Sequence, residues 1–226
     1  MSRTQTPERV CALVGLNTGK PTADRIAIEA SRFGFGDRDI EPIGLTLNEV
    51  DEDPEAAFAA VDGSFLIPWS AGHGFLPKML ARGVYPREIA SFSPPGETPQ
   101  WRLVYGAFKR FGIHAKESVT GPDAAANWQI TKDTRLSLTE PGSNALRLPE
   151  IARYTSAAWL QAFADLGIGV ATLTGEDDEF GQTYIDEGRQ MGRRNRTILT
   201  CHDLLPRNPR DAYEAIDELG ILMRRR

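Results

Sequence analysis

The residue with the clearest capacity for chemistry is Ser70. It lies between a short apolar run at 64–67 and a segment at 75–82 whose apolar residues have helical spacing. A strand, a sharp turn and a helix with a serine at the apex form a nucleophile elbow, which raises the hydroxyl above the carboxyl end of a sheet. The turn also aims the following backbone N–H groups and the helix N-terminus at that point. An ordinary strand-to-helix turn with a capping serine is the other interpretation.

Carboxylates and a histidine follow two later apolar runs. Asp177 and Asp178 follow the run 169–174, and His202 follows the run 196–201. A serine hydroxyl is a weak nucleophile until an adjacent base takes its proton, and histidine can be that base near neutral pH. A carboxylate can fix the imidazole tautomer and stabilise the imidazolium that forms. The chain therefore contains the residue types for acyl transfer through a seryl intermediate.

Other reactive side chains do not form a motif. Neither His73 nor His114 has a second ligand at metal-binding spacing, so we expect no metal, and we interpret His73 as a helix-start residue rather than a base. The glycine-containing loop 15–20 lacks G-x-G-x-x-G and the Gly-Lys-Ser/Thr ending of a phosphate-binding loop. We therefore expect no nucleotide and no other cofactor.

The elements that must position these residues alternate along the chain. Strands and helices alternate up to residue 93, which favours an α/β fold with a mainly parallel sheet of about six strands and helices on both faces. We expect the first strand to lie between the second and third. Residues 94–149 break the pattern, and we interpret them as an insertion, either a lid or an ordered surface excursion. The predicted strands are 10–14, 40–47, 64–67, 88–93, 169–174 and 196–201, and the predicted helices are 23–33, 53–61, 75–82, 102–111, 149–166, 182–191 and 209–222.

Composition sets the outer limits. The 226 residues fit a single domain over 1–226, with 41% hydrophobic and 25% charged residues. The net charge of −5 gives no overall attraction to nucleic acid or to an anionic membrane, and no long apolar span is present. We therefore expect a cytoplasmic protein that acts on a small molecule, with no nucleic-acid or membrane partner, and the oligomeric state stays open. Cys11 and Cys201 lie in apolar runs, so we expect buried thiols rather than a disulfide.

The order of the candidate residues resembles that of the α/β-hydrolase superfamily. Ser70, Asp178 and His202 each follow a predicted strand in the order that the family uses. Residues 173–180 resemble its strand, glycine, two further residues and acid, and residues 201–209 resemble its histidine loop leading into a final helix. The resemblance extends over nearly the whole chain.

The elbow matches the family pattern in part. The family usually has small-x-Ser-x-small, in which Gly72 fits the last position, whereas Pro68 occupies the first. The family's first loop often carries His-Gly, and here residues 15–19 read Gly-Leu-Asn-Thr-Gly.

The resemblance implies a serine hydrolase that cleaves a small ester, thioester or amide. Ser70 would be the nucleophile, His202 the base and acid, and Asp178 the residue that orients the histidine, with Asp177 as its competitor for that role. An enzyme that passes the acyl group to another acceptor is a variant of this interpretation. A non-catalytic member that uses the fold for binding is the alternative from a different class.

The resemblance also implies an oxyanion hole built from backbone N–H groups. One would come from Ala71, directly after the nucleophile, and one from Leu16 or Asn17 in the loop after the first strand.

Overall fold

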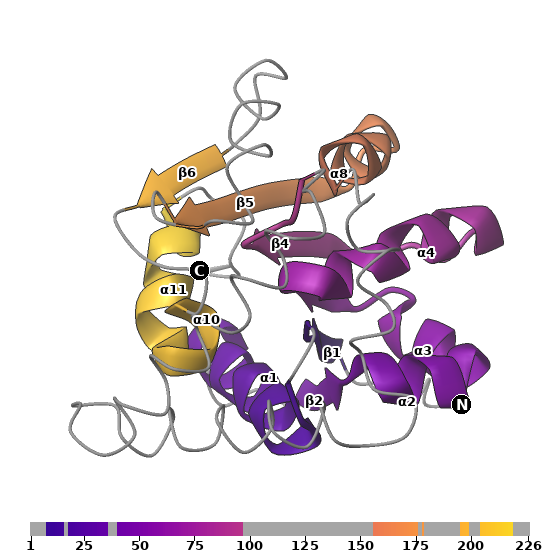
Figure 1. The fold of residues 1–226 in the computed structure, drawn as a ribbon, viewed down its shortest axis with the longest axis horizontal. Helices are drawn as coiled ribbons and strands as arrows, with labels where there is room; N and C mark the ends of the chain where they lie inside the picture. The colour runs from indigo at the N-terminus through magenta and orange to yellow at the C-terminus, as the bar shows by residue number, and fades with distance from the viewer. Residues whose placement is uncertain are drawn as a thin grey trace, which may run out of the picture.

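The computed structural model describes residues 8–15, 18–35, 40–96, 156–175, 178, 195–198 and 204–218. These residues form a sheet with the strand order β2-β1-β3-β4-β5-β6, in which every neighbouring pair is parallel (Figure 1). The parallel sheet and the place of β1 between β2 and β3 are confirmed. The strands are β1 (Glu8–Leu13), β2 (Ile40–Leu45), β3 (Phe65–Pro68), β4 (Glu88–Phe92), β5 (Gly169–Gly175) and β6 (Asn195–Ile198).

Both faces of the sheet are buried, which explains why its strands are continuous apolar runs. In β1, Val10 and Ala12 belong to the core on one face, while Cys11 and Leu13 belong to the core on the other. All four side chains are fully buried. A parallel sheet with helices on both faces requires such strands.

Helices α1 (Lys20–Phe35) and α11 (Pro209–Asp217) cover the first face. Their inward residues repeat at helical spacing, as Ile26 and Ala30 do in α1. The buried Tyr213 of α11 donates a hydrogen bond of 2.8 Å to the carbonyl of Ile26, which fixes the two helices to each other.

Helices α3 (Pro54–Val61), α4 (Leu76–Arg82) and α8 (Ser156–Asp165) cover the other face (Figure 1). The rings of Phe58 and Phe75 stack there with their centroids 4.8 Å apart. Asp53 caps α3 by accepting a hydrogen bond from the N–H of Ala56, as expected for an aspartate before a helix that begins with proline.

Some predicted boundaries were wrong. The second strand ends at Leu45, because Thr46 and Glu49 form a capping box that starts the unpredicted helix α2 (Leu47–Glu52). The turn after β3 is a 3₁₀ helix, η1 (Ser70–Phe75), so α4 begins one residue later than predicted. A second unpredicted short helix is α10 (Leu204–Arg207).

Other sequence predictions fall outside the described residues. These are the insertion 94–149 beyond residue 96, the helices 102–111 and 182–191, the start of 149–166, the end of the strand 196–201 and the end of 209–222.

Cys11 is a buried free thiol, as expected, and it donates a hydrogen bond of 3.1 Å to the carbonyl of Ala60. Burial raises the pKa of this thiol to about 11, so it is neutral and unreactive at physiological pH. Cys201 lies outside the described residues.

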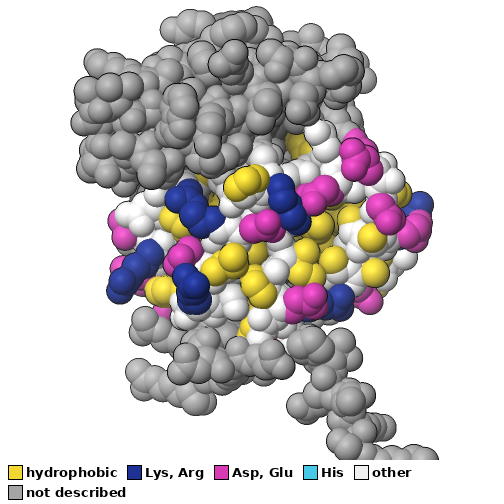
Figure 2. Space-filling view, turned by 90° about the horizontal axis from the view of Figure 1, so that it is seen from below, with side chains coloured by type: hydrophobic (Ala, Val, Ile, Leu, Met, Phe, Trp, Pro, Cys, Tyr) yellow, Lys and Arg dark blue, Asp and Glu magenta, His cyan; other side chains and the backbone are white. Residues whose placement is uncertain are grey.

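The described surface mixes charges of both signs. Figure 2 shows one face on which Lys and Arg side chains alternate with Asp and Glu side chains and apolar groups lie between them. Among the described helices, none is both long and apolar enough to cross a bilayer.

Two glycines that lie in strands should respond differently to replacement by alanine. A Cβ on Gly44 would lie 2.4 Å from the backbone carbonyl carbon of Ala23 and the amide nitrogen of Asp24, where α1 packs on β2, whereas a Cβ on Gly169 meets only the side chain of Glu88 at 3.4 Å. We expect Gly44→Ala to lower the free energy of unfolding by about 2 kcal/mol or more. Gly169→Ala should leave it within about 1 kcal/mol. Urea denaturation measures both, and equal effects would contradict the close packing of α1 on β2.

Candidate active site

Ser70 has a strained backbone at the carboxyl end of a central strand. It follows β3 by two residues and has a φ of 53°, in the left-handed region. A residue with a Cβ pays roughly 1–2 kcal/mol for that conformation. Ser70 is partly exposed, while the other residues of η1 are buried. This geometry is that of the predicted nucleophile elbow, and Pro68, the last residue of β3, does not prevent it.

A second strained residue lies at the same edge of the sheet. Ser93 directly follows β4 and has a φ of 45°, and its N–H donates to the carbonyl of Leu173 over 2.9 Å. Among the described residues, Ser70 and Ser93 are the non-glycine residues with positive φ. Strained backbone tends to gather at functional sites, and here it gathers where neighbouring parallel strands end.

The elbow packs directly on the end of β1. The N–H of Trp69 donates to the carbonyl of Leu13 over 2.9 Å. A Cβ on Gly72 would lie 2.3 Å from that same carbonyl oxygen. Gly72 is therefore required by the close approach of two backbones, which is the physical reason for a small residue two positions after the serine.

Gly15, which follows β1, lies close against the candidate nucleophile. A Cβ on Gly15 would lie 2.7 Å from the Cβ of Ser70 and 3.1 Å from both the Ser70 Oγ and the amide nitrogen of Ala71. The loop after β1 thus begins against the hydroxyl and against one predicted oxyanion-hole donor. Leu16 and Asn17, the other predicted donors, lie outside the described residues.

His73 holds the elbow from the side of β4. Its Nδ1 lies 2.7 Å from the carbonyl oxygen of Ser70, and its Nε2 lies 2.7 Å from the Oγ of Ser91. Both His73 and Ser91 are fully buried. Both ring nitrogens are engaged, which supports the interpretation that His73 is not the base.

Asp178 is buried just beyond the end of β5, where its N–H donates to the carbonyl of Gly175 over 3.1 Å. The strand order places β4 between β3 and β5, so the ends of β3 and β5 are about 10 Å apart. An imidazole between them can contact a side chain from each. Ser70 and Asp178 thus share one edge of the sheet, while Asp177 and His202 lie outside the described residues.

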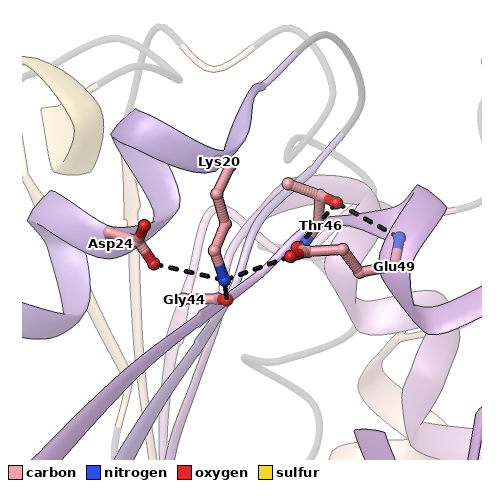
Figure 3. A network of polar contacts seen from close by, with 5 residues as sticks. All are labelled: Lys20, Asp24, Gly44, Thr46 and Glu49. Carbon is pink, nitrogen blue, oxygen red and sulfur yellow. Dashed lines mark hydrogen bonds and ion pairs between the residues drawn. The ribbon is translucent and has the colours of Figure 1, made fainter. Parts of the chain in front are cut away.

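A polar network fixes the far end of the loop that starts at Gly15. Lys20, the first residue of α1, donates to the carbonyl of Gly44 over 2.5 Å and pairs with Asp24 and Glu49 at 3.3 and 3.1 Å (Figure 3). Glu49 also accepts hydrogen bonds from Thr46. The network therefore ties the start of α1 to the end of β2 and the start of α2.

The charges of this network reinforce each other. Burial alone lowers the pKa of Lys20, but the hydrogen bond and charge of Glu49 outweigh it, and the pKa is raised. Burial raises the pKa of Glu49, but hydrogen bonds from Thr46 and the contact with Lys20 lower it overall. Because both side chains are partly exposed, the pair contributes about 1 kcal/mol or less. The main role of the Lys20–Glu49 pair is to hold the start of α1 against the end of β2 and the start of α2.

The similarity of the chain to known proteins lies in its fold. No model of a protein family matches it, and no curated protein matches it. Solved structures do match. NosK from Streptomyces actuosus superposes with a TM-score of 0.59 at 13% identity, over 95% of this chain and 97% of that one.

Two further structures have names that state an activity. A hydrolase from Oleispira antarctica matches with a TM-score of 0.59 at 10% identity, over 95% of this chain and 92% of that one. A thermophilic esterase from Thermogutta terrifontis matches with a TM-score of 0.52 at 13% identity, over 94% and 89%. The chain has the α/β-hydrolase fold.

The order of the strands determines where the elbow lies. Ser70 follows the central strand β3, next to the point where the chain reverses direction between β2 and β3. Ligands of open parallel sheets bind at such a reversal, beyond the carboxyl ends of the strands.

Sequence reasoning missed two contacts of this site. The packing of Gly15 on Ser70 and the pairing of His73 with Ser91 are contacts between separate segments. The spacing of three residues between Ser70 and His73 in a predicted turn could have signalled only the contact of the ring with the Ser70 carbonyl, not the contact with Ser91.

The contact at Gly15 predicts a specific effect. In Gly15→Ala the new methyl group would displace the Cβ of Ser70, and we expect covalent labelling of the serine by a phosphonate to slow by about 10- to 100-fold, because small displacements of reacting groups are costly. Gly169→Ala, which lies at the amino end of β5, is the matched control and should label at the normal rate. Normal labelling of folded Gly15→Ala would contradict the described approach of this loop to Ser70.

Proposed function

We propose that the protein is a serine hydrolase that cleaves a small ester, thioester or amide through an acyl-enzyme on Ser70. His202 is the base and acid, and Asp178 orients it. The observation that carries the proposal is the φ of 53° at Ser70, two residues beyond a central parallel strand. The esterase and the hydrolase among the structures with this fold agree with the proposal.

In the first step the Ser70 hydroxyl attacks the acyl carbon of the substrate while His202 takes its proton. A C–O bond forms, and the carbonyl π bond opens to a tetrahedral oxyanion. The bond to the leaving group then breaks, and His202 returns its proton to the leaving alcohol, thiol or amine. Water repeats these steps on the acyl-enzyme and releases the acid.

The oxyanion requires fixed donors. The N–H of Ala71 is the first, since it directly follows the nucleophile in the elbow. The second comes from Leu16 or Asn17, whose loop begins at Gly15 against Ser70 and Ala71. Preorganised backbone donors stabilise the developing charge without reorganisation.

The proposed orienting role of Asp178 fits its burial. The carboxylate is fully buried beyond β5, at the same edge as Ser70. A buried carboxylate beside an imidazole holds the tautomer that can accept the serine proton and stabilises the imidazolium.

Covalent labelling tests the nucleophile. An organophosphonate should modify the native protein once, on the peptide containing Ser70, because its phosphoryl group resembles the tetrahedral intermediate. Mass spectrometry of the digested protein locates the adduct. Labelling should be absent in Ser70→Ala and in heat-denatured protein, and it should fall sharply in His202→Ala.

The control for labelling is a known serine hydrolase in the same tube. If that enzyme is modified while the folded protein is not, the proposal fails and the chain is a non-catalytic binding protein with this fold.

Two adjacent aspartates test the orienting acid. Asp178→Asn should keep the fold and reduce turnover of a chromogenic ester by about 10⁴-fold, because the amide favours the wrong imidazole tautomer. Asp177→Asn is the matched control and should have little effect. Steady-state kinetics on both variants measures this, and a reversed result would transfer the role to Asp177. Activity retained in both would exclude a triad.

A further inference from the structure

The buried pair His73 and Ser91 takes no part in the chemical steps of the proposed mechanism. Neither side chain is exposed, and the imidazole joins η1 to β4 through its two nitrogens. The ring of His73 contacts the carbonyl of Ser70, the residue with the strained backbone.

The partners of the ring define its proton positions. The carbonyl of Ser70 can only accept a hydrogen bond, so Nδ1 must carry the proton and donate. In the neutral ring Nε2 is then an acceptor, and the hydroxyl of Ser91 donates to it over 2.7 Å. Both nitrogens are satisfied without a charge, which suits a fully buried imidazole.

The elbow is therefore held from two neighbouring strands. On the side of β1, Trp69 donates to Leu13 and Gly72 packs on the same carbonyl. On the side of β4, Ser91 holds the ring of His73, and the ring holds the carbonyl of Ser70. Since β3 lies between β1 and β4 in the sheet, the two sets of contacts fix the turn on both sides.

We propose that His73 is a positioning residue that holds Ser70 in its reactive left-handed conformation by donating Nδ1–H to the Ser70 carbonyl, with Ser91 fixing the tautomer. This role rests on Ser70 being the nucleophile. The role predicts that the contact with Ser70 governs the rate of acylation, and that Ser91 affects this rate by keeping Nδ1 protonated.

Two amide substitutions separate these contributions. In His73→Asn the amide nitrogen is bonded to Cγ, as Nδ1 is, so it can still donate to the Ser70 carbonyl. In His73→Gln the amide lies one atom further out, near the place of Nε2, so it can contact Ser91 but not replace the bond to Ser70. We expect phosphonate labelling within about threefold of the normal rate in His73→Asn and about 10- to 100-fold slower in His73→Gln.

Ser91→Ala provides a second, conservative variant, which keeps the test decisive if His73→Gln does not fold. Without the Ser91 hydroxyl the ring loses the donor that selects its tautomer, and we expect labelling to slow by about tenfold. With a chromogenic ester, the loss in His73→Gln and Ser91→Ala should fall on kcat and leave KM nearly constant, since the ring does not face the substrate.

Tyr213→Phe is the control for a purely structural effect. It removes another buried hydrogen bond, which joins α11 to α1 and involves no residue of the elbow. It should lower the melting temperature and leave the labelling rate unchanged at temperatures where the protein is folded. If His73→Gln and Ser91→Ala behave in the same way, the positioning role is overturned.

The tautomer can be measured without any activity. Two-bond ¹H–¹⁵N correlation spectra of the ¹⁵N-labelled wild type should show His73 neutral, with Nδ1 protonated and Nε2 bare, and this pattern should change in Ser91→Ala. A ring protonated at Nε2 in the wild type would overturn the inference. A wild type that shows the expected tautomer but takes no label would refute the proposed function instead.

Discussion

The left-handed backbone at Ser70 is the constraint on which the rest of this site depends. A serine does not adopt a φ of 53° unless the surrounding structure imposes it. Here Leu13 and Gly72 meet on the side of β1 at a distance that admits no side chain, and His73 holds the Ser70 carbonyl on the side of β4. The strain is thus compensated by contacts with strands on both sides, and Ser70 is left partly exposed.

The order of the strands in the sheet makes this arrangement possible. Because β3 lies between β1 and β4, the turn after it can contact both neighbours, and the loop from Gly15 reaches the hydroxyl from the β1 side. Asp178 follows β5, which lies two strands away from β3. This separation leaves room for an imidazole between the carboxylate and the serine. The Lys20 network fixes the far end of the Gly15 loop to the end of β2. Strands, loop and network thus converge on one edge of the sheet.

The strands were predictable because burial on both faces makes each a continuous apolar run, as in β1 and β3. The start of α2 was missed because Leu47 extends the apolar run of β2, and the capping box of Thr46 and Glu49 was the overlooked signal. In the site, the position of Ser70 was predictable from a local pattern of strand, turn and helix. The contacts of His73 with Ser91 and of Gly15 with Ser70 were not, since they join segments that only the fold brings together.

The proposed chemistry requires the fold to bring His202 to Ser70 at this edge of the sheet. The distance from the Ser70 Oγ to the Nε2 of His202 in a crystal structure of the protein measures this directly. We expect hydrogen-bond reach, about 3 Å or slightly longer without a ligand. A His202 side chain at the opposite end of the sheet, or one directed away from Ser70 in both the free protein and its phosphonate-treated form, would contradict it.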